Sequence, residues 1–326
     1  MKAPLFISSG DLIADRRYKW ALDHAARGDL AAAADILLQT VELAPGFATA
    51  WFALGAIRDV QGDRDGAVAA FAAARDSDSE DFHGARLHLA RLGSGEATPA
   101  MTETYVRRLF DQHAPDFDHA LLERLEYRGP ALLLEAMQSV CQALGRPVSF
   151  SNMLDLGCGT GLAGEAFRPF VARLAGVDLS PGMVEQARAK RLYDRLEAAE
   201  LVQFLRGEPA DSYDLVLAAD VFVYVADLAP ALVGMARVLR PDGLLAFTVE
   251  THEGEGVRLA QTLRYAHSRD YVRTVLADAG LKALRISATS VRTEKGVPVP
   301  GLLMIATKAA DAVYGSSRRN VNSVSS

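Results

Sequence analysis

The chain has 326 residues, more than one compact core usually holds, and its composition (50% hydrophobic, 23% charged) favours an ordinary soluble globular protein with two domains. A net charge of −6 and the lack of a basic stripe argue against a dedicated nucleic-acid binder, so no nucleic-acid partner is expected. Two cysteines without metal-ligand spacing, no signal-peptide core and no long apolar run predict a cytoplasmic protein without a disulfide framework, a metal site or a membrane partner.

Helical repeats are expected in the first hundred residues, which are rich in alanine and contain no convincing strand. This segment is similar to itself at an offset of 34 residues, so that Gly28-Asp29 recurs as Gly62-Asp63. The pattern resembles two tetratricopeptide repeats, with "FHGARLHLARLGSG" as a third or capping helix. An unspecialised alanine-rich helical bundle is the alternative. We expect residues 1–95 to form a helical domain that serves in self-association or in docking a protein partner.

A second domain is expected over residues 96–308, after a linker at 92–101. Its first part has apolar residues at helical spacing, and a Gly-Pro pair separates two helices. Short apolar runs then alternate with helical segments: MLDL, RLAGVD, ELVQFL, YDLVLAAD and LLAFTVE. This alternation predicts a parallel sheet with helices on both faces. "LKALRISATSV" and "GLLMIATKA" are expected to finish the sheet as an antiparallel hairpin, and the polar residues 309–326 to be disordered.

The turn "GCGTG" (residues 157–161) follows an apolar run that ends in an acid, Asp155. At such a strand–loop–helix turn, backbone N–H groups face a ligand. No GK[ST] follows, which excludes a mononucleotide P-loop, and the GxGxG spacing differs from the GxGxxG of dinucleotide folds. Asp155 would repel a pyrophosphate but hold an ammonium group, and Asp178, which ends the next strand, is placed to bind ribose hydroxyls. S-adenosylmethionine presents a positive group, a close-packed middle and a ribose in that order.

The motifs "LDLGCGTG", "GVDLSPGMVEQAR", "YDLVLAADVFVYV" and "ARVLRPDGLLAF" occur in a familiar order and spacing. With them, residues 102–307 resemble a class I S-adenosylmethionine-dependent methyltransferase of the small-molecule type. The resemblance implies a Rossmann-like α/β fold with a seven-stranded sheet of order 3-2-1-4-5-7-6, in which strand 7 is antiparallel. Here that sheet would be preceded by an all-α tetratricopeptide-repeat domain.

The resemblance also implies which residues meet the cofactor. The glycine loop would line the methionine moiety, Asp178 would bind the ribose, and the following residues would flank the adenine. The segment "YVRRLFDQHAPDFDHALL" resembles a lid over the cofactor, the alternative being a simple packing stripe. Asp220 would close the pocket near the sulfonium, unless it caps a helix. The implied contacts are Tyr105, Phe110, Asp155, Gly157, Cys158, Gly159, Asp178, Leu179, Met183, Glu200, Leu201 and Asp220.

Methyl transfer is an in-line displacement at a sulfonium carbon, so the protein chiefly aligns the reactants and excludes water. A general base is required only where the nucleophile has to lose a proton. Candidates should lie beyond the carboxyl ends of strands 4 and 5, where open parallel sheets bind ligands. The catalytic candidates there are His267, then Tyr224 and His252, with Glu250 and Tyr265 close in sequence. As alternatives, Tyr224 is a packing residue, and Glu250 and His252 are solvated loop residues.

The sequence therefore predicts methyl transfer from S-adenosylmethionine to a small-molecule or carrier-bound acceptor through an oxygen, nitrogen or carbon nucleophile, with S-adenosylhomocysteine as the product. "ADVFVY" in place of an Asn/Asp-Pro-Pro-Tyr sequence disfavours methylation of adenine N6 or of glutamine. One alternative is a non-catalytic S-adenosylmethionine-binding protein that uses its repeats to recruit a partner. A nicotinamide-dependent oxidoreductase is a second alternative, which Asp155 and the GxGxG spacing disfavour.

Overall fold

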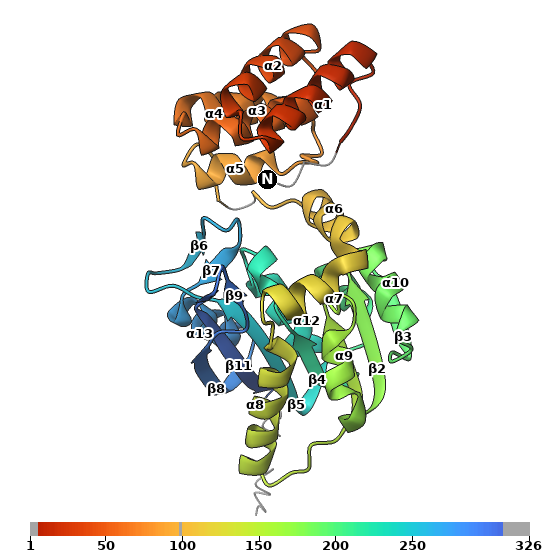
Figure 1. Cartoon of the computed structure of the whole chain (residues 1–326). Helices are drawn as coiled ribbons and strands as arrows, with labels where there is room; N and C mark the ends of the chain where they lie inside the picture. The colour runs from red at the N-terminus through yellow and green to blue at the C-terminus, as the bar shows by residue number, and fades with distance from the viewer. Residues whose placement is uncertain (1–5, 98–99, 309–326) are drawn as a thin grey trace, which may run out of the picture.

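The computed structural model describes residues 6–97 and 100–308. An all-helical N-terminal part lies above a mixed α/β part that contains the sheet, and helix α6 (Glu103–His113) lies between them (Figure 1). The tail that was expected to be disordered, residues 309–326, lies outside the described residues.

The N-terminal part repeats a pair of antiparallel helices. Each second helix begins after an aspartate whose carboxylate accepts a backbone N–H three residues later: Asp29 caps one helix and Asp63 the other. The offset of 34 residues in the sequence thus corresponds to a repeated pair of helices. The assignment of these pairs as tetratricopeptide repeats stays a prediction. The helices are α1 (Leu12–Ala26), α2 (Leu30–Leu43), α3 (Ala48–Val60), α4 (Arg64–Asp76) and α5 (Ala85–Arg91).

A largely parallel sheet organises the rest of the described chain. Its strands follow the order β3-β2-β1-β4-β5-β11-β8, and β11 runs antiparallel to both of its neighbours. The expected terminal hairpin is therefore present, as β8 and β11. The main strands are β1 (Phe150–Leu156), β2 (Val171–Asp178), β3 (Arg195–Ala198), β4 (Tyr213–Ala218), β5 (Leu239–Glu250), β8 (Leu281–Thr289) and β11 (Gly301–Lys308). A separate two-stranded ribbon is formed by β9 (Thr293–Glu294) and β10 (Val297–Pro298).

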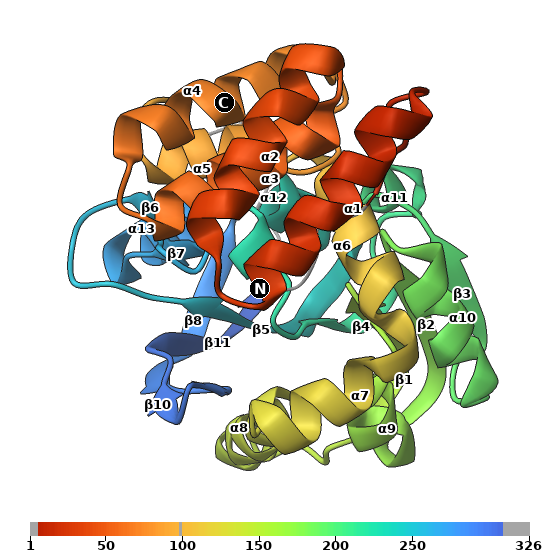
Figure 2. The same cartoon turned by 45° about the horizontal axis from the view of Figure 1, so that its top comes forward.

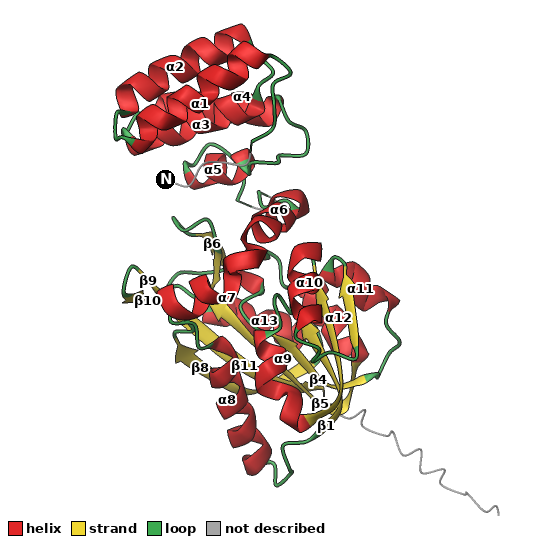
Figure 3. Ribbon diagram, turned by 45° about the vertical axis from the view of Figure 1, so that its right-hand side comes forward, coloured by secondary structure: helices red, strands yellow, loops and turns green. Residues whose placement is uncertain are grey.

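Helices cover both faces of this sheet (Figure 3). Successive strand residues point to opposite faces, so Met153 packs in one core with α8 and α9, while Leu154 packs in the other with α11, α12 and α13. Because both faces are buried, these strands read as continuous apolar runs. The helices are α8 (Gly129–Ala143), α9 (Leu162–Phe167), α10 (Pro181–Ala189), α11 (Leu201–Gly207), α12 (Ala229–Val238) and α13 (Arg269–Asp278).

The prediction of the third strand was wrong. The run ELVQFL, predicted as a strand, forms the start of α11, and the third strand is the preceding, mostly exposed β3. Glu200 caps α11, since its carboxylate accepts two backbone N–H groups of the first turn. Helical spacing then places Phe204 and Leu205 in the core beside α12.

Two short strands extend the sheet beyond the seven that were predicted. β6 (Val257–Leu259) and β7 (Tyr265–His267) form a hairpin, and β7 pairs in parallel with the end of β5 at Glu250. The segment that contains the catalytic candidate His267 is therefore regular structure, and it adds a wall above the carboxyl edge of the sheet.

The helical part contacts the α/β part through α6 and β7 (Figure 2). The ring of Tyr105 lies so close to Gly84 that an added Cβ there would be 2.7 Å from it, and the guanidinium of Arg108 lies 3.4 Å from the ring centroid of Phe82. The Tyr265 hydroxyl donates to a backbone carbonyl of the linker at 2.6 Å. One side of α6 is thus fixed by the turn that precedes α5.

Candidate active site

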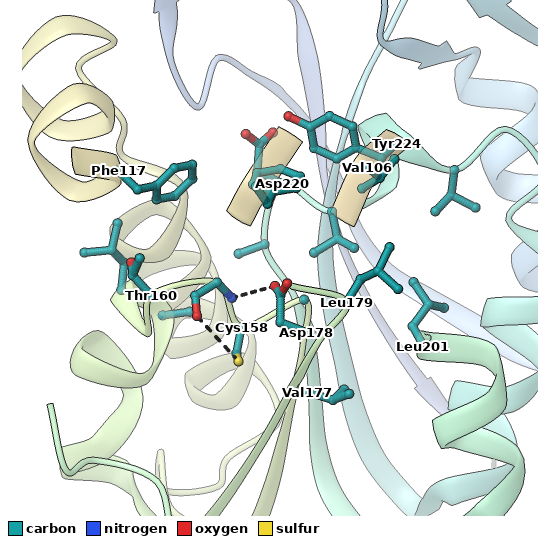
Figure 4. A pocket seen from close by; sticks show the side chains of 18 of the residues that line it. Val106, Phe117, Cys158, Thr160, Val177, Asp178, Leu179, Leu201, Asp220 and Tyr224 are labelled. Carbon is teal, nitrogen blue, oxygen red and sulfur yellow. Dashed lines mark hydrogen bonds between the residues drawn. The ribbon is translucent and has the colours of Figure 1, made fainter. Parts of the chain in front are cut away.

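A cavity opens at the carboxyl edge of the sheet, beneath a lid formed by α6, the short turns after it and α7 (Phe117–His119). Figure 4 shows Asp178 and Cys158 at its floor, with Phe117 on one side and Asp220 and Tyr224 opposite the loop. The lining comprises Val106, Phe110, Phe117 and Tyr127 from the lid side, Gly157, Cys158, Gly159 and Thr160 from the glycine loop, Asp178 and Leu179 after β2, Ala199, Glu200 and Leu201 after β3, Asp220, Val221 and Tyr224 after β4, and Arg264 and Arg292 from the loops beyond β5, among others.

The glycine loop is held to the end of β2 by its own backbone. The N–H of Cys158 donates to the carbonyl of Val177 at 3.0 Å, and the N–H of Gly159 donates to a carboxylate oxygen of Asp178 at 2.9 Å. The second oxygen of Asp178 accepts the N–H of Ser180 at 2.9 Å. Burial raises the pKa of Asp178, and these two N–H donors oppose the shift. The carboxylate is thereby fixed at the cavity beside the loop, where the expected ribose contact requires it.

Asp155 does not have the contact that was expected. Its carboxylate is 1% exposed, it is not among the residues that line the cavity, and it accepts the hydroxyl of Tyr193 at 2.7 Å. Tyr193 lies in the loop after α10, and the other carboxylate oxygen, Oδ1, is buried without a hydrogen-bond partner among the described residues. The direct contact with a ligand ammonium is therefore corrected to a structural hydrogen bond beneath the glycine loop.

Stability should depend on pH through Asp155. Burial raises the pKa of this carboxyl from 3.8 to about 7 in the folded chain, although the hydrogen bond from Tyr193 opposes the shift. The folded state then binds more protons than the unfolded state between the two pKa values, so this group's contribution to stability falls as pH rises through that window. From about pH 5.5 to about pH 7.5 the loss should be about 2 kcal/mol, and urea denaturation of Asp155→Asn should lack it. An equal pH response in both proteins would contradict this assignment.

An apolar slot lies beside Asp178, where the adenine contacts were expected. Leu179 and Leu201 line it, whereas Met183 is fully buried in α10 and does not reach the cavity, which corrects that prediction. Glu200 lines the slot, with both carboxylate oxygens occupied as the cap of α11. An acid at the ribose position and an apolar slot next to it fit a nucleoside.

Aromatic rings form the upper wall of the cavity. Phe110 packs edge-on against Tyr224, with ring centroids 5.1 Å apart, and against Phe117 at 5.9 Å. All three line the cavity, and such offset contacts are favourable geometries for aromatic pairs. Tyr105 was expected beside Phe110, but its ring lies against the helical repeats and does not line the cavity. One turn of α6 thus separates a residue that faces the site from one that faces the repeats.

The lid is also fastened to the body of the domain on both sides of the glycine loop. Asp111 accepts the Ser180 hydroxyl at 2.5 Å and the N–H of Gly182 at 3.0 Å, at the start of α10. Asp118 accepts the hydroxyl of Thr160 in the glycine loop and pairs with Lys190 at 2.7 Å. In this structure the lid is therefore closed over the loop and Asp178.

A buried charge cluster occupies the side of the cavity opposite the glycine loop. Arg292, 2% exposed, donates through Nη1 to both oxygens of Asp220 at 2.7 and 2.5 Å and through Nη2 to Glu250. Arg264 donates through Nη1 to Glu294, its Nη1 lies 3.9 Å from Oε1 of Glu250, and its side chain lies near Tyr224. Burial raises the pKa of Glu250, while the two arginines oppose the shift. Asp220 thus lines the cavity with both carboxylate oxygens bound by Arg292, and it does not cap a helix.

Neither predicted histidine lines the cavity. His267 is fully buried, and its Nε2 lies 3.0 and 3.1 Å from the carbonyl oxygens of Val225 and Ala226, to which it donates. Burial lowers the pKa of His267 to about 4, which keeps the ring neutral near pH 7. His252 accepts the N–H of Gly254 at 3.0 Å within its own loop. Of the three catalytic candidates, only Tyr224 lies at the site.

Arg264 and Arg292 were not found by sequence reasoning. Arg264 lies in the turn before β7, and Arg292 lies in a loop that is joined to the lid by backbone hydrogen bonds, including one from the N–H of Arg128 to the carbonyl of Val291 at 2.7 Å. Surface loops carry arginines routinely, and no local pattern marks these two as buried. Their signal is tertiary: the hairpin and the loop fold over the carboxyl edge.

Within residues 6–97 and 100–308, no group of three or more His, Cys, Asp or Glu side chains is arranged to hold a metal ion. Within the same residues, the helices are too short or too polar to cross a bilayer.

Comparisons with known proteins agree on one activity. A family model described as "Methyltransferase domain" matches residues 154–247. Methyltransferase-like protein 27 of Homo sapiens is 32% identical over 196 residues, which cover 59% of this chain and 73% of that protein. Aklanonic acid methyltransferase from a Streptomyces strain is 28% identical over 152 residues, covering 44% of this chain and 64% of the relative. A malonyl-[acyl-carrier protein] O-methyltransferase of Acetivibrio thermocellus is 34% identical over 103 residues, which cover 31% of this chain and 36% of that enzyme.

Two solved structures are similar to part of the chain. The N-methyltransferase NodS of Bradyrhizobium japonicum, in complex with S-adenosylhomocysteine, is 21% identical with a TM-score of 0.48, covering 63% of this chain and 98% of that chain. The 1,6-didemethyltoxoflavin-N1-methyltransferase of Burkholderia thailandensis, with S-adenosylhomocysteine bound, is 20% identical with the same TM-score, covering 63% and 88%.

The cofactor is S-adenosylmethionine, and the nicotinamide alternative is rejected. The evidence is the match to the methyltransferase model and to most of the human relative, together with a Rossmann-like sheet that has an acid and a glycine loop at its carboxyl edge. The chain belongs to the class I S-adenosylmethionine-dependent methyltransferases.

Proposed function

We propose that this methyltransferase acts on a small-molecule or carrier-bound acceptor by in-line displacement. The observation that carries the proposal is the two-ended cavity, which has a glycine loop and Asp178 at one end and an aromatic wall with Tyr224 at the other. The names of two relatives, an aklanonic acid methyltransferase and a malonyl-[acyl-carrier protein] O-methyltransferase, support acceptors of this class.

The residues have distinct roles in this proposal. Gly157 and Gly159 let the loop approach the methionine moiety, Asp178 binds the ribose hydroxyls, and Leu179 and Leu201 enclose the adenine. When bound, the cofactor supplies an electrophilic methyl group on a sulfonium. The protein's part is to hold the acceptor in line with that methyl and to exclude water.

The lid supplies the exclusion of water. Phe110 and Phe117 lie over the cavity, and the bonds of Asp111 and Asp118 to the body keep them there. A closed aromatic lid removes water that would otherwise solvate the reacting groups. Binding of a protein partner, or of a second copy of the chain, by the helical repeats stays a prediction.

Calorimetric titration tests the cofactor end. The purified protein should bind S-adenosylmethionine and S-adenosylhomocysteine and give no signal with NAD. Asp178→Asn should weaken both interactions by about tenfold or more, because it removes a charge-assisted hydrogen bond of about 1.5–3 kcal/mol. The matched control is Asp214→Asn, on the opposite edge of the sheet, where Asp214 accepts the N–H groups of Ser151 and Asn152.

The acceptor class is tested with S-adenosylmethionine that carries a labelled methyl group. A cell extract is first separated into small molecules, carrier-bound acyl groups, other proteins and RNA. Label in either of the first two fractions supports the proposal. Label only in bulk protein or RNA contradicts it, as does cofactor binding without transfer to any fraction.

A further inference from the structure

We propose that the reacting atom of the acceptor is an ionised oxygen, that of a carboxylic acid or of an equally acidic enol or phenol, and that Arg264 and Tyr224 bind it. The inference rests on the proposed function, since it names the chemical class that enters the same cavity. It is carried by the hydrogen-bond donors that face the cavity and by the lack of a free base among the described residues that line it.

Arg264 is held in place from behind. It precedes β7 and lines the cavity beside Tyr224, and its Nη1 donates to Glu294. A guanidinium carries five N–H donors in a planar fork that matches the two oxygens of a carboxylate. With Nη1 bound to Glu294, the other donors of this fork are left for a ligand in the cavity.

Within the cluster, the side that faces the cavity holds both arginines and one carboxylate: Arg264, Arg292 and Asp220 line the cavity, whereas Glu250 and Glu294 do not. The other acids of the lining, Glu103, Asp178 and Glu200, belong to the lid and to the cofactor end of the cavity. Both oxygens of Asp220 are already bound by Arg292, so this carboxylate does not offer a free partner to an ammonium group.

The described residues that line the cavity also offer no free base inside it. The carboxylates of Asp178, Glu200 and Asp220 are each occupied by hydrogen bonds from the protein, and Glu103 is exposed to solvent at the start of α6. Burial raises the pKa of Tyr224, which keeps it a hydroxyl donor. A nucleophile that has to lose a proton would have no group to take it, whereas an acid that arrives ionised needs none.

The transfer then balances without a proton. The acceptor oxygen forms a bond to the methyl carbon while the carbon–sulfur bond breaks, and the electron pair of that bond stays on sulfur. The negative charge of the oxygen and the positive charge of the sulfonium cancel, which gives a methyl ester or ether and a neutral thioether. Arg264 keeps the oxygen ionised and oriented until the bond forms, and releases it once the charge is gone.

Binding of a matched aromatic series tests the proposal. Naphthoate, naphthamide and naphthylmethylamine share a ring system that suits the wall of Phe110, Phe117 and Tyr224 and differ in the charge of one group. Each is titrated calorimetrically into protein saturated with S-adenosylhomocysteine. Naphthoate should bind at least about tenfold more tightly than naphthamide, a difference of about 1.4 kcal/mol, and naphthylmethylamine should bind most weakly.

Variants assign that preference to Arg264. Arg264→Gln should abolish the preference for naphthoate over naphthamide, and Arg264→Lys should restore part of it because the charge returns without the planar fork. Arg258→Gln, which removes the same charge from exposed β6 of the same hairpin, should leave the preference unchanged. Affinity for S-adenosylhomocysteine should be equal in all four proteins.

Three results would overturn the inference: naphthamide or naphthylmethylamine binding as tightly as naphthoate, no binding of naphthoate up to about 10 mM, or a preference that survives in Arg264→Gln. These results differ from a failure of the proposed function, in which the unmodified protein would not bind S-adenosylhomocysteine at the start of the experiment.

Discussion

Arg292→Met should lower the free energy of unfolding by about 3–5 kcal/mol. Arg292 is 2% exposed and donates to Asp220 and Glu250, two carboxylates that are themselves largely buried. Removing the guanidinium leaves both acids in a low-dielectric environment without their partner, and this is the costly way to break a buried ion pair. Urea denaturation of the purified protein, monitored by far-UV circular dichroism, measures the change.

Two further variants separate the loss of the charge from the loss of the side chain. Arg285→Met makes the same replacement at an exposed position of β8 and should change stability by no more than about 0.5 kcal/mol. Adding Asp220→Asn and Glu250→Gln to Arg292→Met removes the stranded charges and should recover most of the lost stability. If Arg292→Met lowers the free energy of unfolding by no more than Arg285→Met does, the ion pairs of Arg292 do not stabilise the folded chain.

The cluster is costly to keep, and that bears on why it is present. A well-packed apolar group of the same volume is often as stable as a buried ion network, or more stable. An ion network beside the catalytic cavity therefore points to a requirement of the site. In the proposal above, Arg292 occupies Asp220 so that Arg264 faces the acceptor without a competing free carboxylate.

Much of the fold follows from short-range patterns in the chain. The strand runs are continuous and apolar because both faces of the sheet are covered, and the aspartates that begin equivalent repeat helices mark the offset of 34 residues. The error at ELVQFL has a simple cause. A short apolar run of this kind can form either a strand or a helix, and here Glu200 favours the helix because its carboxylate caps the first turn of α11.

The candidate site likewise contains residues that the sequence predicts and residues that it does not. Gly157, Gly159 and Asp178 belong to one contiguous strand–loop–helix–strand unit, so their spacing places them together at the cavity. Asp155 belongs to the same motif, but its environment depends on Tyr193, which comes from a loop 38 residues away. A motif predicts where such an acid lies along the strand, whereas its partner depends on tertiary packing.

Site residues from distant loops could not be predicted from the sequence for the same reason. His267 was expected to face the site because it follows strand 5, but the hairpin of β6 and β7 turns its ring into the core. The same hairpin brings Arg264, three residues before His267, to the cavity wall. The register of a short hairpin therefore decides which side chain is available for chemistry, and no local sequence signal states that register.

Gly157→Ala should cost about 2–5 kcal/mol of stability and lower the affinity for S-adenosylmethionine by at least about tenfold. Gly157 has a φ of +66°, which costs about 1–2 kcal/mol for a residue with a Cβ. In addition, that Cβ would lie 2.4 Å from Cγ2 of Val221, so the loop or the segment after β4 has to move. Since the loop lines the cavity, the shift should weaken binding of the cofactor. Urea denaturation and calorimetric titration give the two quantities.

Gly159 provides the matched control for this substitution, because both glycines have a positive φ and line the cavity. Its φ is +52°, yet an added Cβ would meet nothing within 4 Å, so Gly159→Ala should lose about 1–2 kcal/mol of stability from the backbone alone. Val221→Ala, added to Gly157→Ala, removes the atoms that clash and should bring the loss back toward that of Gly159→Ala, with part of the cofactor affinity restored. Equal losses in the two single variants, or no recovery in the double variant, would mean that Val221 yields to the new Cβ. The close contact between the glycine loop and the segment after β4 would then not be what fixes the shape of the cofactor site.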